Sequence, residues 1–217
     1  MILYATALSS YSAKVRIVLI AKGVGYEERE PPDGYRSLAY RALVPMGTLP
    51  ALEDDGFVLS ESEAINEYLE ERFPAPPLRP ATPAARAQGR FLSRFHDLYL
   101  EPPVRALFAH VSPLRRDPAV VAARMDELRQ RIEQLATLAK PAPYLVGEGL
   151  SLADCGYAVT LPLAEMLAVA LGEVLVLPPA VAQWQTLLAR HAVVERALQS
   201  WRPATQQWIA ARLAATT

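Results

Sequence analysis

Cysteine, lysine and histidine are scarce in this chain of 217 residues. It contains one cysteine, Cys155, and three histidines, and lysine occurs only at Lys14, Lys22 and Lys140. A single cysteine excludes a disulfide framework within the chain and a cysteine-rich metal site, which is typical of a reducing compartment. We therefore expect a cytoplasmic protein without a bound metal ion.

Long apolar runs and net charge are missing as well. No uninterrupted apolar run of about 18 residues occurs, and the N-terminal segment 1–5 has no basic residue, so neither a membrane span nor a secretion signal is expected. The formal net charge is -1, which gives no field to hold nucleic acid or an anionic membrane. Hydrophobic residues make up 52% and charged residues 21%, which predicts a folded chain long enough for two small domains.

The first 72 residues alternate strand-like and helix-like patterns. The expected order is strand, helix, strand, hairpin, helix, at residues 2–5, 12–22, 26–29, 49–52 with 57–59, and 60 or 61 to 71. This order predicts a small mixed sheet with helices on both faces. Gly23 is expected to end the first helix, and the segment 53–56 to form the hairpin turn.

The rest of the chain has helical periodicity interrupted by prolines. Too many prolines lie in the segment 73–80 for regular structure, which predicts a linker. We expect a first domain at 1–73, a linker at 74–83 and an all-helical domain at 84–217. Pro102 and Pro103 should interrupt or bend the fourth helix near its middle.

Two linked motifs carry a family resemblance. The segment 44–52 reads Val-Pro-Met-Gly-Thr-Leu-Pro-Ala-Leu, and the segment 59–69 reads Leu-Ser-Glu-Ser-Glu-Ala-Ile-Asn-Glu-Tyr-Leu. Together they resemble the signatures of the glutathione transferase superfamily, whose first domain is thioredoxin-like and whose second is an all-helical bundle. The resemblance implies a cis peptide at Leu49-Pro50, so that the backbone of Leu49 faces outward and pairs with glutathione.

The second motif implies two further glutathione ligands. Ser62, at a helix N-terminus, is expected to hold the γ-glutamyl carboxylate, and Glu61 to accept a hydrogen bond from the ammonium group. A simpler alternative is a capping box between Ser60 and Glu63 that only starts the helix. Both interpretations can hold together.

A third motif, at residues 9–19, resembles the serine-type and zeta-like members of the superfamily. A catalyst must stabilise the thiolate of glutathione, because an unperturbed thiol has a pKa of about 8.5. The resemblance implies that Ser9 is the hydroxyl donor, with Ser10 as the nearest rival and Tyr4 third. The alternative for either serine is a helix N-cap. Tyr11 stands where zeta-like members carry cysteine, which argues against a mixed-disulfide mechanism.

Other family ligands match less closely. The expected glutathione contacts on the proline motif are Thr48, Leu49 and Pro50, although Thr48 replaces the Lys or Gln often found at its position. Arg36 or Arg41 could supply positive charge for the glycyl carboxylate, but an arginine in contact with solvent is the simpler interpretation of either.

The helical domain contributes structural and pocket candidates. Ser151 and Asp154 resemble a family capping segment and are expected to stabilise a buried helix, with Cys155 as a small core residue. His96 and Tyr99, three residues apart, are expected to share a helix face and, with Tyr11, to line the pocket for the electrophile.

The resemblance implies a glutathione transferase that adds the thiolate to a small hydrophobic electrophile, as in detoxification. A glutathione-dependent isomerase or reductive dehalogenase is the related alternative. A different class is a non-catalytic adaptor such as the stringent starvation proteins, which bind RNA polymerase and resemble residues 47–79. The superfamily also implies a homodimer. Glutathione and a small electrophile are the expected ligands, with neither nucleic acid nor membrane as a partner.

Overall fold

The protein is described by a computed structural model that covers residues 1–215. Its N-terminal part is built on a four-stranded sheet in the order β2-β1-β3-β4. The strands are β1 (Ile2–Tyr4), β2 (Glu27–Arg29), β3 (Ala51–Asp54) and β4 (Phe57–Ser60). Strand β1 is parallel to β2 and antiparallel to β3, and β3 and β4 form the expected hairpin. Asp55 and Gly56 form the tight turn between β3 and β4, and both have the positive φ that such a turn requires.

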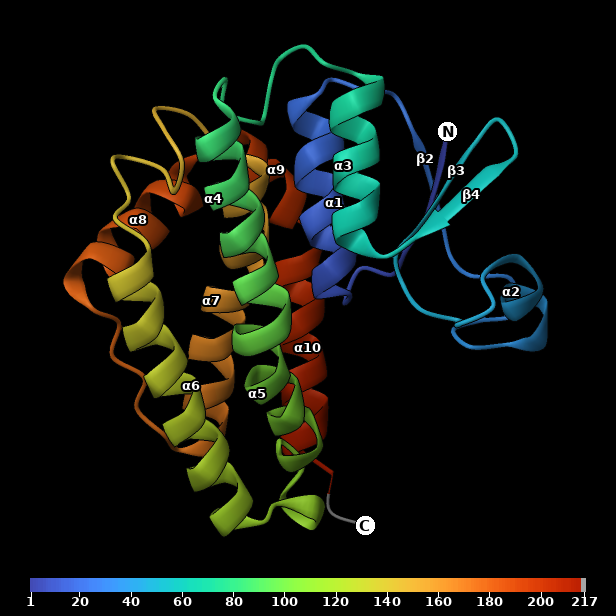
Figure 1. Cartoon of the computed structure of the whole chain (residues 1–217). Coiled ribbons are helices and arrows are strands. Elements are labelled where there is room, and N and C mark those ends of the chain that lie inside the picture. The colour runs from blue at the N-terminus through green and yellow to red at the C-terminus, as the bar shows by residue number, and fades with distance from the viewer. Residues whose placement is uncertain (216–217) are drawn as a thin grey trace.

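Three helices accompany this sheet: α1 (Ser10–Ala21), α2 (Leu38–Leu43) and α3 (Ser62–Arg72). Helices α1 and α3 lie side by side between the sheet and the helical region, whereas α2 projects at the far end of the unit (Figure 1). The sequence patterns did not predict α2, because its six residues bury only Tyr40 and give no amphipathic repeat.

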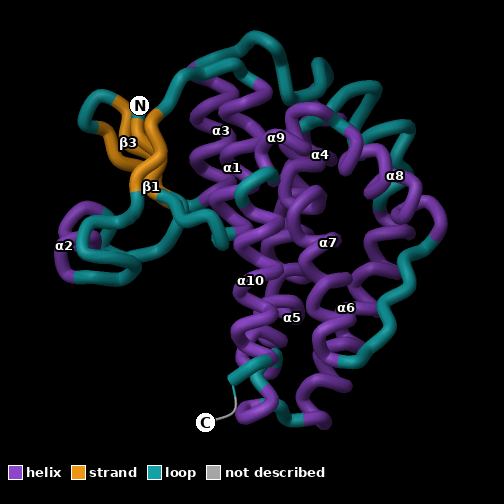
Figure 2. The backbone as a smooth tube through the Cα atoms, turned by 180° about the vertical axis from the view of Figure 1, so that it is seen from behind, coloured by secondary structure: helices purple, strands orange, loops and turns teal. Residues whose placement is uncertain are grey.

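All regular elements of the remaining chain up to residue 215 are helices, as expected. Its elements are α4 (Pro83–Phe95), the π-helix η1 (His96–Leu100), α5 (Glu101–Ala106), the 3₁₀ turns η2 (Leu107–His110) and η3 (Pro113–Arg115), α6 (Pro118–Leu138), α7 (Leu152–Leu171), α8 (Pro179–Arg190), α9 (Ala192–Leu198) and α10 (Trp201–Leu213). Figure 2 shows this bundle beside the small sheet. The fold is therefore a mixed α/β unit followed by a helical bundle, which confirms the predicted fold class.

Helix α7 is the centre of the bundle. By length and apolar composition it could cross a membrane, but 78% of its most apolar window is buried inside the protein. It packs against α1 of the N-terminal part and against α4, α5, α8 and α10. The two parts therefore share one continuous core, in which α1 is the element that joins them.

The start of α7 is held as the sequence predicted. The buried carboxylate of Asp154 accepts hydrogen bonds from the backbone N–H groups of Leu145 and Ser151, at 3.1 and 2.9 Å, and from the indole of Trp184 at 3.0 Å. Burial raises the pKa of Asp154, and these hydrogen bonds only partly offset the shift. Its role is structural, and Cys155 beside it is fully buried.

The helix that Pro102 and Pro103 were expected to interrupt or bend is interrupted, by a π-helical turn that directly precedes the segment containing both prolines. Proline has no N–H, so neither residue can donate to the carbonyl one turn earlier, and the helix widens over His96–Leu100. This turn is the part of the bundle that faces the N-termini of α1 and α3.

Candidate functional site

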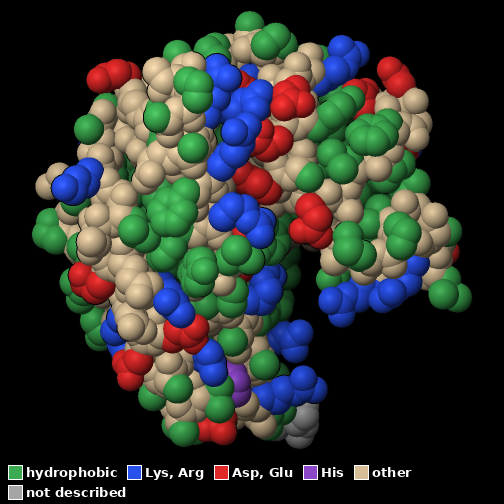
Figure 3. All heavy atoms as spheres, viewed as in Figure 1, with side chains coloured by type: hydrophobic (Ala, Val, Ile, Leu, Met, Phe, Trp, Pro, Cys, Tyr) green, Lys and Arg blue, Asp and Glu red, His purple; other side chains and the backbone are tan. Residues whose placement is uncertain are grey.

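A cleft of about 880 Å³ lies between the N-terminal part and the helical region. In the space-filling view the surface is deeply indented at this boundary, and charged side chains of both signs line up above the indentation (Figure 3). The residues that line the cleft come from five segments: Thr6 and Leu8 to Tyr11; Tyr35 and Arg36; Thr48 and Leu49; Glu61 to Ala64 and Glu67; and Arg94, Asp97, Leu98, Arg105 and Phe108.

The two adjacent serines at the start of α1 have different hydrogen-bonding roles. Ser9 is the N-cap, and its hydroxyl accepts from the backbone N–H of Ser12 at 3.1 Å, which leaves its own hydrogen without an acceptor within residues 1–215. The hydroxyl of Ser10 donates to Glu101 at 3.2 Å and accepts from Arg105 at 2.9 Å. Of these two serines, only Ser9 therefore has a hydroxyl hydrogen that no residue within 1–215 accepts.

The start of α3 has no side-chain cap. Its N-cap residue, Glu61, has φ of 73° and makes no capping hydrogen bond, and Ser62 is the first helical residue. The alternative capping box is wrong, because Ser60 belongs to β4 and the carboxylate of Glu63 pairs with Lys14. No side chain within residues 1–215 caps the first N–H groups of α3, which lie at the cleft next to a backbone conformation that is costly for a non-glycine residue.

The loop before β3 completes this wall of the cleft. The Leu49-Pro50 peptide is cis, as the family resemblance implied. Thr48 and Leu49 line the cleft, whereas Pro50 is buried behind them. The N–H and C=O of Leu49 pair with no other backbone group within the described chain, and so remain open to an extended ligand.

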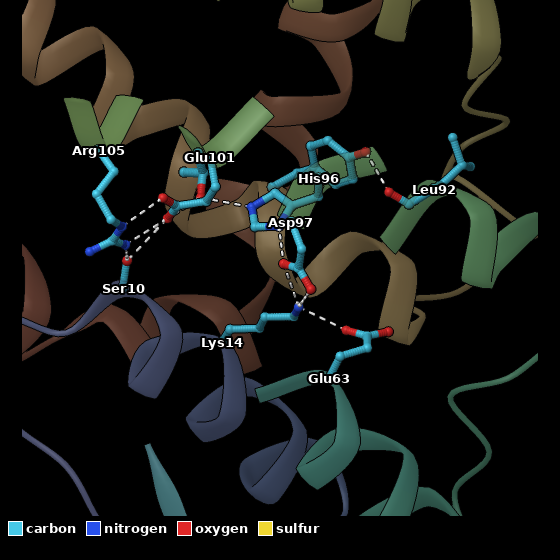
Figure 4. A network of polar contacts seen from close by, with 10 residues as sticks. Ser10, Lys14, Glu63, Leu92, His96, Asp97, Glu101 and Arg105 are labelled. Atoms are coloured by element: carbon cyan, nitrogen blue, oxygen red, sulfur yellow. Dashed lines mark hydrogen bonds and ion pairs between the residues drawn. The ribbon is translucent and has the colours of Figure 1, made fainter. Parts of the chain in front are cut away.

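A buried polar network joins these elements to the π-helical turn (Figure 4). The ammonium of Lys14, a residue that is 1% exposed, lies 2.7 Å from the carboxylate of Glu63 and 3.1 Å from that of Asp97. His96 contacts Asp97 and Thr160, each at 2.8 Å. Lys14 thus links α1, the first turn of α3 and η1 at one point.

Burial and neighbouring charges shift the pKa values of two residues that line the cleft. Burial alone would raise the pKa of Asp97, but the hydrogen bond from His96 and the charge of Lys14 outweigh it and hold the pKa at about 2. Burial and the charge of Glu101 raise the pKa of Tyr11, so that its phenol stays protonated. Asp97 is therefore an anion at neutral pH, and Tyr11 can act there as a hydrogen-bond donor.

Two of the pocket candidates lie elsewhere. His96 is buried against Tyr157 of α7, with ring centroids 5.0 Å apart, whereas Tyr99 is 46% exposed and stacks on Phe95. The prediction that His96 and Tyr99 share a face is wrong, because π-helical spacing turns them apart. Tyr4 also lies outside the cleft, where its hydroxyl donates to Glu53 at 2.8 Å. Of these aromatic candidates, Tyr11 lines the cleft.

Three charged side chains of the cleft have no charged partner within residues 1–215: Arg36, Glu61 and Arg94. The other charges are paired, either with Lys14 or, for Glu67 and Arg105, with Arg79 and Glu101. No group of metal-binding side chains occurs in the same part of the chain. The cleft is therefore suited to a ligand with one positive and more than one negative group.

A small mixed sheet with a cis-proline loop, set against a helical bundle across such a cleft, is the architecture of glutathione S-transferases. The chain belongs to this family. Residues 3–77 match the family model described as the N-terminal domain of glutathione S-transferase.

Similar proteins carry more than one name. A stringent starvation protein A homolog from Pasteurella multocida is 37% identical over 155 residues, which cover 71% of this chain and 70% of that protein. A glutathione S-transferase from Pseudomonas putida is 30% identical over 163 residues, 75% and 74% of the two chains.

Solved structures give the same picture of the fold. A theta-class glutathione S-transferase from Xanthomonas axonopodis pv. citri, determined with glutathione bound, has a TM-score of 0.76 and 26% identity over 91% of this chain and 96% of its own. Maleyl pyruvate isomerase, a bacterial zeta-class member, has a TM-score of 0.73 and 27% identity over 94% of this chain and 99% of its own.

Proposed function

We propose that this protein binds glutathione in the cleft and catalyses transfer of its thiolate to a small electrophile. The observation that carries the proposal is the pair of helix N-termini at the cleft. Helix α3 presents uncapped N–H groups at Ser62, and α1 presents Ser9 with a free hydroxyl hydrogen. The N–H groups of α3 suit a carboxylate, and the hydroxyl of Ser9 suits a thiolate.

The remaining groups of the tripeptide also find partners of the right kind. Glu61 has an unpaired carboxylate for the α-ammonium, and the open backbone of Leu49 can pair with the cysteinyl unit like an added strand. Arg36 has an unpaired guanidinium for the glycyl carboxylate, and Thr48 has a buried hydroxyl without a partner. The ammonium and the glycyl carboxylate of glutathione therefore match Glu61 and Arg36, and its γ-glutamyl carboxylate matches the N–H groups at the start of α3.

In this proposal Ser9 is the catalytic residue. Its hydroxyl donates to the sulfur, lowers the pKa of the bound thiol and keeps more of it as the thiolate that attacks. Ser10 does not donate to the sulfur in this proposal, because its hydroxyl hydrogen is already given to Glu101. Tyr11 is the second possible donor to the sulfur or to the electrophile.

Titration calorimetry with reduced glutathione, run in two buffers of different ionisation enthalpy, tests the assignment. Wild type should bind and release a proton near neutral pH. Ser62→Ala keeps the backbone N–H groups and removes only the hydroxyl that we expect to donate to the same carboxylate, so it should bind roughly tenfold more weakly, since one hydrogen bond to a charged group contributes about 1.5–3 kcal/mol. Ser9→Ala should bind with less proton release. Ser10→Ala is the matched control and should keep the proton release, with Tyr11→Phe testing the second donor.

No binding at millimolar glutathione would refute the proposal and would favour a second candidate, a non-catalytic adaptor. The relatives named stringent starvation protein A homolog support that candidate. An isomerase that uses glutathione without consuming it is the third, supported by the likeness to maleyl pyruvate isomerase. The isomerase would show glutathione binding and proton release but no lasting thioether product. We further propose that the protein is a cytoplasmic homodimer.

A further inference from the structure

Arg105 is the most constrained cation of the cleft. Its Nε and Nη2 atoms donate to the buried carboxylate of Glu101 at 3.1 and 3.0 Å, and Nη2 also donates to Ser10 at 2.9 Å. The guanidinium lies over the ring of Tyr11 at 4.9 Å and over that of Phe108 at 5.1 Å. Figure 4 shows it reaching from α5 to the start of α1.

One edge of this guanidinium is unused. Nη1 makes no hydrogen bond or ion pair with the described residues, and 45% of the Arg105 side chain is exposed at the cleft. A guanidinium donates through five N–H groups in a fixed plane, so the bonds on one side determine where the free pair points. Arg105 is thus a fixed donor pair beside apolar and aromatic side chains.

Arg105 lies at the end of the cleft where the start of α1 places Ser9, the residue assigned to the thiol. It contacts Ser10 and Tyr11, the residues that follow Ser9 in the chain. Arg94 differs, because Arg90 on the same helix pairs with Glu67 of α3, which places Arg94 along the α3 side. The two arginines therefore face different parts of a bound pair of substrates.

We propose that the second substrate is an electrophile that carries a carboxylate on an apolar or aromatic skeleton, and that Arg105 binds this carboxylate through Nη1. This inference rests on the proposed function. Leu98, Tyr11 and Phe108 contact the skeleton, and the fixed carboxylate turns the reactive carbon toward the sulfur held by Ser9. The pairing with Glu101 keeps the guanidinium of Arg105 in place, and the free Nη1 gives selectivity for an electrophile that carries a carboxylate.

The test compares two matched aromatic electrophiles, 4-chloro-3,5-dinitrobenzoate and its methyl ester. In both, the thiolate forms a C–S bond at the carbon that bears chlorine, the C–Cl bond breaks, and chloride leaves with the bonding pair. The thiol proton goes to solvent. Each kcat/KM is divided by the uncatalysed rate with glutathione, which removes the difference in intrinsic reactivity. Wild type should prefer the acid by about 10- to 100-fold, the range for one hydrogen bond to a charged group.

The variants separate anion binding from damage to the network. Glu101→Gln/Arg105→Gln removes both charges without leaving a buried one unpaired, and it should abolish the preference for the acid. Glu101→Gln alone disturbs the same network but keeps the arginine, so the preference should survive. Arg94→Gln is the control on the α3 side and should leave the acid-to-ester ratio unchanged.

Dissociation constants of the two glutathione conjugates, measured by calorimetry, give the same ratio without turnover. Equal values for acid and ester in wild type, or a preference that persists in the double variant, would overturn the assignment of Arg105 while the transferase function stands. If glutathione and both conjugates fail to bind, the proposed function itself fails.

Discussion

Replacing Lys14 by methionine should show how much the free energy of unfolding depends on one buried charge, the ammonium that links α1, α3 and η1. Methionine has a similar length and no charge, so the change keeps most of the packing and removes the ammonium. It leaves the carboxylates of Glu63 and Asp97 beside each other with 17% and 14% of their side chains exposed and no shared cation. Breaking a buried ion pair in this way costs about 3–5 kcal/mol.

The pH dependence gives this prediction its sign. Asp97 has a folded-state pKa of about 2 against an ordinary value of 3.8, so it contributes about 2 kcal/mol of stability. Because the folded value is the lower one, this contribution is fully present above the ordinary pKa and is lost as the pH falls from about 4 through 2. Removing Lys14 removes one cause of this low value, so the pKa of Asp97 should rise and the deficit of the variant should be largest near pH 7.

Urea unfolding followed by circular dichroism at pH 3, 5 and 7 measures the free energies of unfolding. The expected deficit of Lys14→Met is about 3–5 kcal/mol at pH 7 and shrinks towards pH 3, where Asp97 of the variant begins to protonate. Lys14→Arg is the matched control that keeps the charge. A deficit below about 1 kcal/mol at pH 7, or one that is the same at all three pH values, would refute the reasoning.

Two further predictions concern helix α7. A Cβ at Gly156 would lie 2.7 Å from the ring of His96, so Gly156→Ala should lower the free energy of unfolding by about 1–3 kcal/mol, and an unchanged thermal midpoint would contradict this contact. Burial, with the nearby charge of Asp154, raises the pKa of the Cys155 thiol well above its usual value, so Ellman's reagent should react with it only after denaturation. Rapid labelling of the native protein would show instead that α7 opens locally.

The sequence predicted the elements whose signals are local. The hairpin follows from the Asp55-Gly56 turn between two apolar runs, and the start of α7 follows from Ser151 and Asp154. Helix α2 was missed, because a six-residue helix with one buried side chain has no periodicity to detect.

What the sequence could not predict is the set of partners that lie far apart in the chain. Ser9 and Ser10 have the same chemistry, and only the position of Glu101, 91 residues after Ser10, decides which hydroxyl keeps a free hydrogen. Lys14 and Asp97 likewise form a hydrogen bond although 83 residues separate them in the sequence. No pattern within either segment marks these contacts, although a lysine among the apolar residues of an otherwise buried helix is a hint that a carboxylate must meet it.

The two helix N-termini at the cleft also bear on whether the protein is an enzyme or an adaptor. Helix α1 is capped by Ser9, whereas α3 begins without a side-chain cap at a glutamate with φ of 73°. A missing cap and a left-handed non-glycine residue each cost about 1 kcal/mol or more, and substitution by serine or glycine would recover much of it. An adaptor that binds its partner through its outer surface has no use for an uncapped helix start and a strained residue inside a cleft. A ligand whose carboxylate accepts hydrogen bonds from these N–H groups would offset both free-energy costs. This argument favours a functional ligand-binding site over a fold that has kept the cleft without using it.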